Sequence, residues 1–99
     1  MREQYVARNA RTAWRVYDGQ AVILLAADST LNTLNAVGTV IWENADGRTP
    51  LSAIVERVCE TFEVERARAE RDSAAFIEKL RQRGLLAVSE SPSEERSTP

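Results

Sequence analysis

The sequence of 99 residues contains no histidine and a single cysteine, Cys59. Without histidine there is no Ser–His or Cys–His nucleophile pair, no histidine general base and hardly any of the common zinc sites. A lone cysteine cannot form a disulfide within the chain, and on its apolar stripe Cys59 is expected to be a buried thiol. We therefore expect a protein that is not an enzyme and that uses no metal or cofactor.

Long apolar runs are also absent. No stretch of about 18 apolar residues is available for a transmembrane helix, and the opening MREQYVARNA lacks the apolar core of a signal peptide. The net charge of −2 gives no general attraction to nucleic acid. With 43% hydrophobic residues the chain can bury one modest core, so we expect a single cytoplasmic domain without membrane association.

Composition divides the chain into three parts. Residues 1–11 are polar and irregular, which predicts a flexible lead-in. Residues 89–99 are rich in Ser, Glu and Pro, which predicts a disordered tail. The folded domain is then expected to span residues 12–88.

Two strand-like segments, TAWRVY and QAVILLA, are separated by Asp18-Gly19, the favoured kind of pair for a two-residue hairpin turn. The register set by this turn places Trp14, Val16, Ala21 and Ile23 on one face of the hairpin. That apolar face is predicted to be the core face of a small antiparallel sheet.

A third, shorter strand is predicted at TLNTL, residues 30–34, and its polar character is typical of a sheet edge. Asn35 then fits the N-cap of a helix, because its side-chain oxygen can accept a free backbone N–H. Gly38 costs roughly 1 kcal/mol against alanine inside a helix, so it indicates close packing against a neighbour.

Two more helices are predicted, from Pro50 to Phe62 and from Ala67 to Arg83. The helix boundaries are marked by Asp46-Gly47, Thr49-Pro50 and Gly84. The inward positions of the last helix are Ala69, Ser73, Phe76, Ile77 and Leu80. Together these elements predict an α+β fold of the winged helix-turn-helix type, with a three-stranded antiparallel sheet followed by three helices.

The order and spacing of several short motifs resemble the PqqD family of small peptide chaperones, which are also called precursor-peptide recognition elements. The matching features are Leu34-Asn35, Gly38, Ile41-Trp42, Asp46-Gly47, the amphipathic helix 50–63, Asp72 and Gly84-Leu85-Leu86. The resemblance covers about residues 12–88. It implies that the protein binds the leader segment of a ribosomally synthesised precursor peptide and presents it to a modifying enzyme, often a radical S-adenosylmethionine enzyme.

The resemblance also implies that the leader adds as an extra strand to the third strand, beside the last helix. An open sheet edge can accept such a strand, because its N–H and C=O groups are unpaired. The groove is expected to be lined by Leu31, Leu34, Ala74, Ile77 and Arg81. The full set of expected peptide contacts is Thr30, Leu31, Asn32, Thr33, Leu34, Arg71, Ala74, Ile77 and Arg81. The last helix is locally basic, which favours an acidic peptide.

A different class, a DNA-binding winged helix, would use the last helix as its recognition helix. The acidic net charge and the acidic middle helix disfavour nucleic acid as the partner. The residues leave open whether the pathway makes pyrroloquinoline quinone or another modified peptide, and whether the protein is a homodimer. Trp42 is expected to pack in the core or at its border, and Asp72 either to cap a helix or to pair with a neighbouring arginine.

Overall fold

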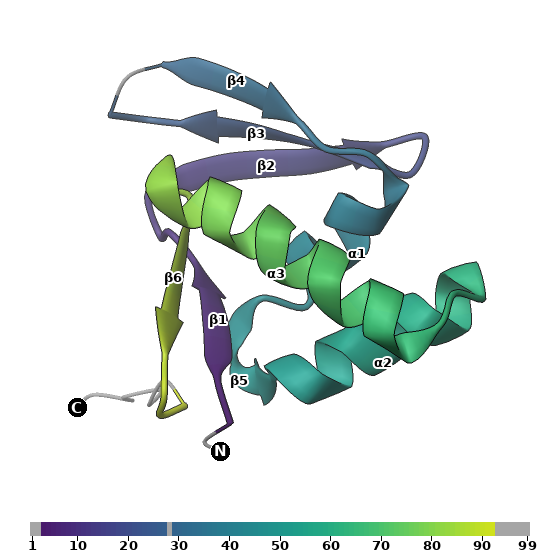
Figure 1. The fold of residues 1–99 in the computed structure, drawn as a ribbon. Helices are drawn as coiled ribbons and strands as arrows, with labels where there is room; N and C mark the ends of the chain where they lie inside the picture. The colour runs from purple at the N-terminus through teal and green to yellow at the C-terminus, as the bar shows by residue number, and fades with distance from the viewer. Residues whose placement is uncertain (1–2, 28, 93–99) are drawn as a thin grey trace.

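A computed structural model describes residues 3–27 and 29–92 of the chain. Its elements are β1 (Tyr5–Arg8), β2 (Thr12–Tyr17), β3 (Gln20–Leu25), β4 (Thr30–Thr33), α1 (Ala36–Glu43), β5 (Asp46–Pro50), α2 (Leu51–Phe62), α3 (Arg66–Gln82) and β6 (Leu86–Ser89). The predicted α+β fold is confirmed, with a three-stranded antiparallel sheet followed by three helices (Figure 1). A second three-stranded sheet, in the order β5-β1-β6, was not predicted.

The first sheet has the order β2-β3-β4, and its hairpin has the predicted register. Asp18 and Gly19 both take positive φ angles, 51° and 75°, as the two-residue turn requires. Trp14 therefore pairs with Ile23, and Val16 with Ala21. On the other side of β3, Leu24 pairs with Leu31 and Ile23 with Asn32. β4 is thus an edge strand of this sheet, as the sequence predicted.

Only part of the predicted core face is buried. Ala21 and Ile23 are fully buried, but Trp14 is 36% and Val16 is 38% exposed. These two residues lie on β2, the other edge strand, whereas α1 packs against the central strand β3. Trp14 instead packs edge-on against Trp42 of α1, with ring centroids 5.9 Å apart and an interplanar angle of 88°.

The first helix begins as predicted and ends earlier. Asn35 is the N-cap of α1, and its Oδ1 accepts the backbone N–H of Gly38 at 2.8 Å. The C-cap is Asn44, so the helix stops before Asp46-Gly47. This pair lies instead at the start of β5, where Gly47 takes a φ angle of 80°. Asp46-Gly47 was therefore correctly predicted as a break in the chain, but it starts a strand and does not cap the helix.

The other two helices follow the prediction closely. α2 begins at Leu51 after an N-cap at Pro50, one residue later than expected. α3 is followed by Gly84, which takes a positive φ of 78°. Four of the five expected inward positions of α3 are buried, and the fifth, Phe76, is half-buried.

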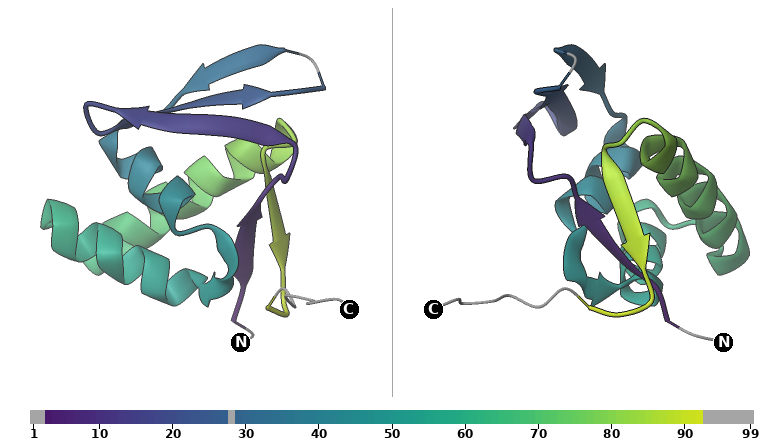
Figure 2. Two further views of the ribbon diagram at one scale, coloured as in Figure 1. Left: turned by 180° about the vertical axis from the view of Figure 1, so that it is seen from behind. Right: turned by 90° about the vertical axis from the view of Figure 1, so that its left-hand side faces the viewer.

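The expected flexible lead-in at residues 1–11 is wrong, because it contains β1. This strand pairs with β5 on one side and β6 on the other, so it is the centre of the second sheet (Figure 2). Val6 is fully buried in the core. The folded part of the chain therefore begins before Thr12. Of the predicted tail, residue 89 ends β6, and residues 93–99 lie outside the described residues.

Arg8 links the second sheet to α1. Its Nη1 donates to the main-chain oxygen of Trp42 at 2.7 Å and to that of Glu43 at 3.1 Å. These carbonyls belong to the last turn of α1, where a positive charge and additional donors are favourable. The same guanidinium lies 5.1 Å from the centre of the Trp14 ring. Arg8 thus joins β1, α1 and the first sheet.

None of the helices in the described part of the chain is long and apolar enough to cross a membrane.

Replacing Val6 by alanine tests the structural role of β1. Because Val6 is fully buried, we expect Val6→Ala to lower the free energy of unfolding by about 1–3 kcal/mol. Urea denaturation followed by circular dichroism measures this change. Gln4→Ala, an exposed position on the same segment, is the control. Equal stability of the Val6 variant and the wild type would contradict a structured N-terminal strand.

The close approach of α1 to α3 can be tested at Gly38. A Cβ atom there would lie 2.7 Å from Cε1 and 2.9 Å from Cζ of Phe76. We expect Gly38→Ala to lower the free energy of unfolding by about 1–2 kcal/mol, because overpacking outweighs the gain in helix propensity. In a Phe76→Ala background the same change should be neutral or stabilising. A double-mutant cycle by urea denaturation gives the coupling, and additive effects would exclude the contact.

Candidate functional site

The backbone of β4 presents an open edge. The N–H of Leu34 donates to the main-chain oxygen of Ala21 at 2.8 Å, which fixes the phase of the ladder between β3 and β4. Bonded and non-bonded pairs alternate along an antiparallel ladder. The N–H and C=O groups of Leu31 and Thr33 therefore point away from β3. They are available to an added strand.

A hollow of about 250 Å³ lies between the end of β4 and α3. It is lined by Thr33, Leu34, Asn35, Phe76, Lys79, Leu80 and Arg83. We call it the β4–α3 hollow. Its α3 side chains follow the spacing i, i+3, i+4 and i+7, so they form one stripe of the helix and its C-terminal end. Its lining joins apolar side chains to two cationic ones.

Arg83 bridges the two walls of this hollow. It caps the C-terminus of α3, and its Nη1 donates to Oδ1 of Asn32 on β4 at 2.9 Å. The side chain of Asn32 thus points to the α3 side of the sheet. Because side chains alternate along a strand, Leu31 and Thr33 point to the opposite face. A peptide beside β4 would pass the Arg83 guanidinium.

The structure places residues 30–34 together on β4 and directly after it. The other residues of the expected groove lie on separate surfaces. Leu34 is buried and lines the β4–α3 hollow. Leu31 is 64% exposed on the outer face of the sheet. The prediction that Leu31, Leu34, Ala74, Ile77 and Arg81 line one groove is therefore wrong, because these residues lie on different surfaces.

Ala74, Ile77 and Arg81 line another hollow, of about 370 Å³, on a different side of α3. Its remaining lining residues come from the residue before β1, from β1, α2 and β6, and from α3 itself: Gln4, Val6, Leu51, Val88 and Glu78. Arg71 is exposed and lines neither hollow. The sequence identified α3 correctly, but each residue turns by about 100° around a helix, so a shift of one position selects a different face. Phe76, Lys79, Leu80 and Arg83 are the α3 residues at β4.

The missed α3 residues did have a signal in the sequence. Phe76 was expected to point inward. Because α3 lies beside both α1 and the edge of the sheet, part of its apolar side is exposed where α1 ends and the sheet edge begins. Lys79 and Arg83 follow Phe76 at the same helical phase, at i+3 and i+7. The two cations Lys79 and Arg83, aligned with the apolar Phe76, therefore indicated in the sequence which side of the helix lies next to the sheet.

Ion pairs reduce the basic character of α3 to three side chains. Arg66 pairs with Glu70, Arg68 with Asp72 and Arg81 with Glu78, at 3.2, 3.5 and 2.6 Å respectively. The remaining cations of the helix and its C-cap are Arg71, Lys79 and Arg83, and none of them forms an ion pair with a carboxylate in the described segments 3–27 and 29–92. Two of these three line the β4–α3 hollow. Its lining contains no carboxylate, so it favours an acidic ligand.

The Glu78 carboxylate is strongly engaged by Arg81. Nε of Arg81 donates to Oε1 at 2.8 Å, and Nη2 lies 2.6 Å from Oε2. These hydrogen bonds, together with one from Gln82, lower the pKa of Glu78 from 4.5 to about 2. Arg81 is thus held beside Glu78, away from β4.

A larger hollow, of about 450 Å³, is lined by residues that include Glu3, Ser52, Arg66 and Glu70. Its charged groups are engaged with the protein itself. The Ser52 hydroxyl donates to Oε1 of Glu3 at 2.9 Å, and Arg66 pairs with Glu70. These contacts cap α2 and hold the start of α3, so they indicate a structural role.

Other sequence predictions have clear outcomes. Trp42 is fully buried in the core, and Asp72 pairs with Arg68. Cys59 is half-buried against the core, without a disulfide partner among the described residues.

Comparison with known proteins identifies the family of this chain. A family model described as "Coenzyme PQQ synthesis protein D (PqqD)" matches residues 20–86, from β3 to the start of β6. The chain belongs to the PqqD family. In this PqqD-family protein the match includes β4, α3 and every residue that lines the hollow between them.

A solved structure has a similar fold. It is "TbiB1 in Complex with the TbiA(beta) Leader Peptide", with a TM-score of 0.75 and 28% sequence identity. The similarity covers 81% of this chain and 93% of the TbiB1 chain. No curated protein matches the sequence.

The low pKa of Glu78 gives a pH-dependent prediction. Because the folded-state pKa is about 2, below the ordinary 4.5, the Glu78–Arg81 pair contributes stability above pH 4.5. That contribution is lost as the pH falls from 4.5 toward 2. NMR titration of side-chain carboxyl carbons should show a midpoint of about 2 for Glu78. In Arg81→Gln the midpoint should rise toward 4.5, and an ordinary midpoint in the wild type would exclude the pairing.

Proposed function

We propose that this PqqD-family protein binds the leader segment of a ribosomally synthesised precursor peptide by strand addition to β4, and presents it to a modifying enzyme. Three observations support the proposal. The chain belongs to the family by a match over residues 20–86. The similar protein TbiB1 is solved with a leader peptide. The open edge of β4 lies beside an apolar hollow with two cations.

The open edge is the single observation that carries the mechanism. Leu31 and Thr33 supply two N–H donors and two C=O acceptors, spaced as an antiparallel or parallel partner requires. A peptide that bonds to them extends the sheet to four strands. Alternate peptide side chains then enter the β4–α3 hollow, where burial and charge give specificity. This step binds and orients the peptide and needs no catalytic group.

The presented peptide would pass to a modifying enzyme. The family resemblance suggests a radical S-adenosylmethionine enzyme, and the product of the pathway is either pyrroloquinoline quinone or another modified peptide. A second copy of the chain could also pair with β4, so the oligomeric state has to be measured beside peptide binding. The comparisons contain no support for the alternative of a DNA-binding winged helix.

An NMR titration tests the proposed site. Labelled protein is titrated with the leader half of the short peptide encoded beside its gene, and sedimentation measures the mass before and after. We expect saturable shifts at residues 30–34 and at Phe76, Lys79, Leu80 and Arg83, with a mass equal to one peptide per chain. Shifts confined to other surfaces would overturn the site. Salt-sensitive shifts with duplex DNA, and none with the peptide, would overturn the function.

Thr33→Pro removes one of the two edge N–H groups. The ladder to β3 should survive, because the Thr33 N–H points to the open edge. The loss of one hydrogen bond of about 0.5–1.5 kcal/mol should weaken peptide binding about 2–10-fold. Isothermal calorimetry measures the affinity. Thr33→Ala keeps the N–H and removes only the side-chain contacts, so it should weaken binding less than Thr33→Pro does. Unchanged affinity in a folded Thr33→Pro protein would exclude strand addition at this edge.

A further inference from the structure

The face of the first sheet that points away from the helices carries an apolar row of side chains that crosses all three strands. One cross-strand row consists of Ala13, Leu24 and Leu31, and the next consists of Arg15, Val22 and Thr33. Leu24 is 39% and Leu31 is 64% exposed. We call this surface the outer face. A shallow hollow of about 220 Å³ on it is lined by residues of both rows.

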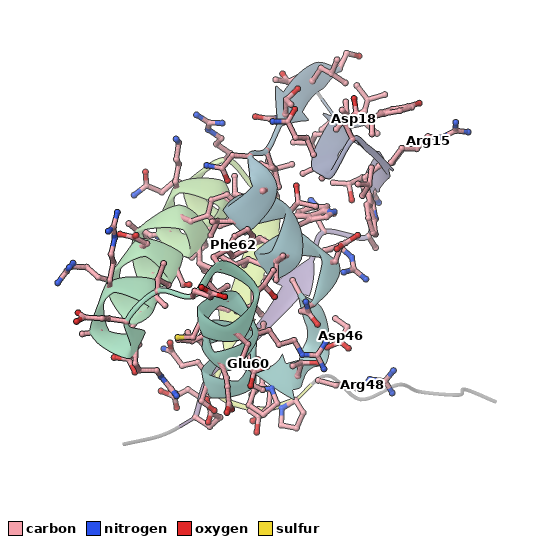
Figure 3. The ribbon with its side chains drawn as sticks, turned by 90° about the vertical axis from the view of Figure 1, so that its right-hand side faces the viewer. Arg15, Asp18, Asp46, Arg48, Glu60 and Phe62 are labelled. Carbon is pink, nitrogen blue, oxygen red and sulfur yellow. The ribbon has the colours of Figure 1, made fainter. Side chains whose placement is uncertain are left out.

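Charged residues lie toward the β2 side of this surface, away from β4. Figure 3 shows Arg15 extending away from the helices, with Asp18 at the neighbouring turn. The β4 side ends at Leu31, whose side chain is the most exposed of the large apolar residues that the structure describes. The row therefore ends in an apolar side chain with only one cross-strand neighbour, Leu24. An added strand would supply the missing neighbour.

Strand addition at β4 determines which peptide side chain meets Leu31. The N–H and C=O of Leu31 point to the open edge, so an antiparallel peptide strand places one residue in a hydrogen-bonded pair directly opposite Leu31, with its Cα about 5.5 Å away. Residues that lie opposite each other in a sheet share a face. The side chain of this peptide residue therefore projects onto the outer face beside Leu31. The residues immediately before and after it project toward α3.

The inner side offers different chemistry. Lys79 and Arg83 line the β4–α3 hollow, and Arg83 already reaches the side chain of Asn32 on β4. The lining of this hollow includes no acidic side chain, and the three arginine–carboxylate pairs of α3 lie elsewhere on the helix. A peptide carboxylate that projects inward would thus meet two cations without a competing anion.

We propose that this protein recognises its peptide on both faces of the extended sheet, through an apolar residue opposite Leu31 on the outer face and an adjacent acidic residue directed at Lys79 and Arg83. The inference rests on the proposed function and names the class of peptide that the site selects. Leu31 is the specificity-determining residue of the outer face. Lys79 and Arg83 determine specificity on the inner side.

Selection from a random library tests the proposal without knowledge of the natural peptide. A display library of random ten-residue peptides is selected on the immobilised full chain. For the wild type we expect enriched peptides with an acidic residue next to an apolar one. For Leu31→Lys we expect loss of the apolar preference, with the acidic preference retained. For the Lys79→Glu, Arg83→Glu double variant we expect the acidic preference to be lost and the apolar preference to remain.

Tyr17→Lys is the matched control for Leu31→Lys. Tyr17 is on the same sheet and 56% exposed, but it pairs with Gln20 and has no partner on β4. An unchanged peptide profile for this variant, beside an altered one for Leu31→Lys, supports contact at the sheet edge. An equal change in both variants indicates general adhesion to the outer face and overturns the proposal.

Affinities of one enriched peptide complete the test. Replacing its apolar residue by alanine should weaken binding to the wild type about 2–5-fold, and should have no effect on Leu31→Lys. Fluorescence anisotropy measures both. Enriched peptides without an apolar residue at a fixed distance from the acidic one would overturn the two-faced recognition alone. A wild-type protein that enriches no peptide would overturn the proposed function as well.

Discussion

The close approach of α1 to α3 at Gly38 is the contact on which the site depends. The Phe76 ring occupies the space that any side chain at position 38 would fill. α1 is in turn attached to the sheet, because the hydroxyl of Thr39 accepts the N–H of Ala21 at 2.8 Å and donates to the main-chain oxygen of Asn35 at 2.9 Å. This hydroxyl satisfies a buried strand amide just where β4 ends. The position of α3 relative to β4 follows from these two contacts.

The site joins two kinds of recognition that use different physics. The edge of β4 offers backbone groups, which bind an extended peptide with little regard to its sequence. The side chains on the two faces supply selectivity, with Leu31 on one side and the apolar and cationic hollow on the other. Because successive residues of a strand alternate between faces, neighbouring positions of one peptide experience opposite environments. A short edge strand can therefore select a sequence pattern.

Electrostatics on α3 depends on pairing more than on composition. The helix carries an excess of basic residues, yet the arginines at positions 66, 68 and 81 are paired with carboxylates three or four residues away. Within the described residues, the positive charge of this helix and its C-cap that no carboxylate pairs lies at Lys79 and Arg83 near β4 and at the exposed Arg71. Charge counting predicted an acidic ligand, but the pairing indicates which side of the helix would meet it.

The sequence by itself determined the local features. Asp18-Gly19 requires a tight turn and so sets the hairpin register, Asn35 caps α1, and the polar strand 30–34 ends the sheet, because each depends on residues close in the chain. Only the tertiary structure decided which side of α3 faces β4, since the rotation of a helix is fixed by what packs against it. The same holds for β1, four residues whose hydrogen bonds go to β5 and β6. A strand so short has no pattern of its own, and pairing with distant segments makes it part of the core.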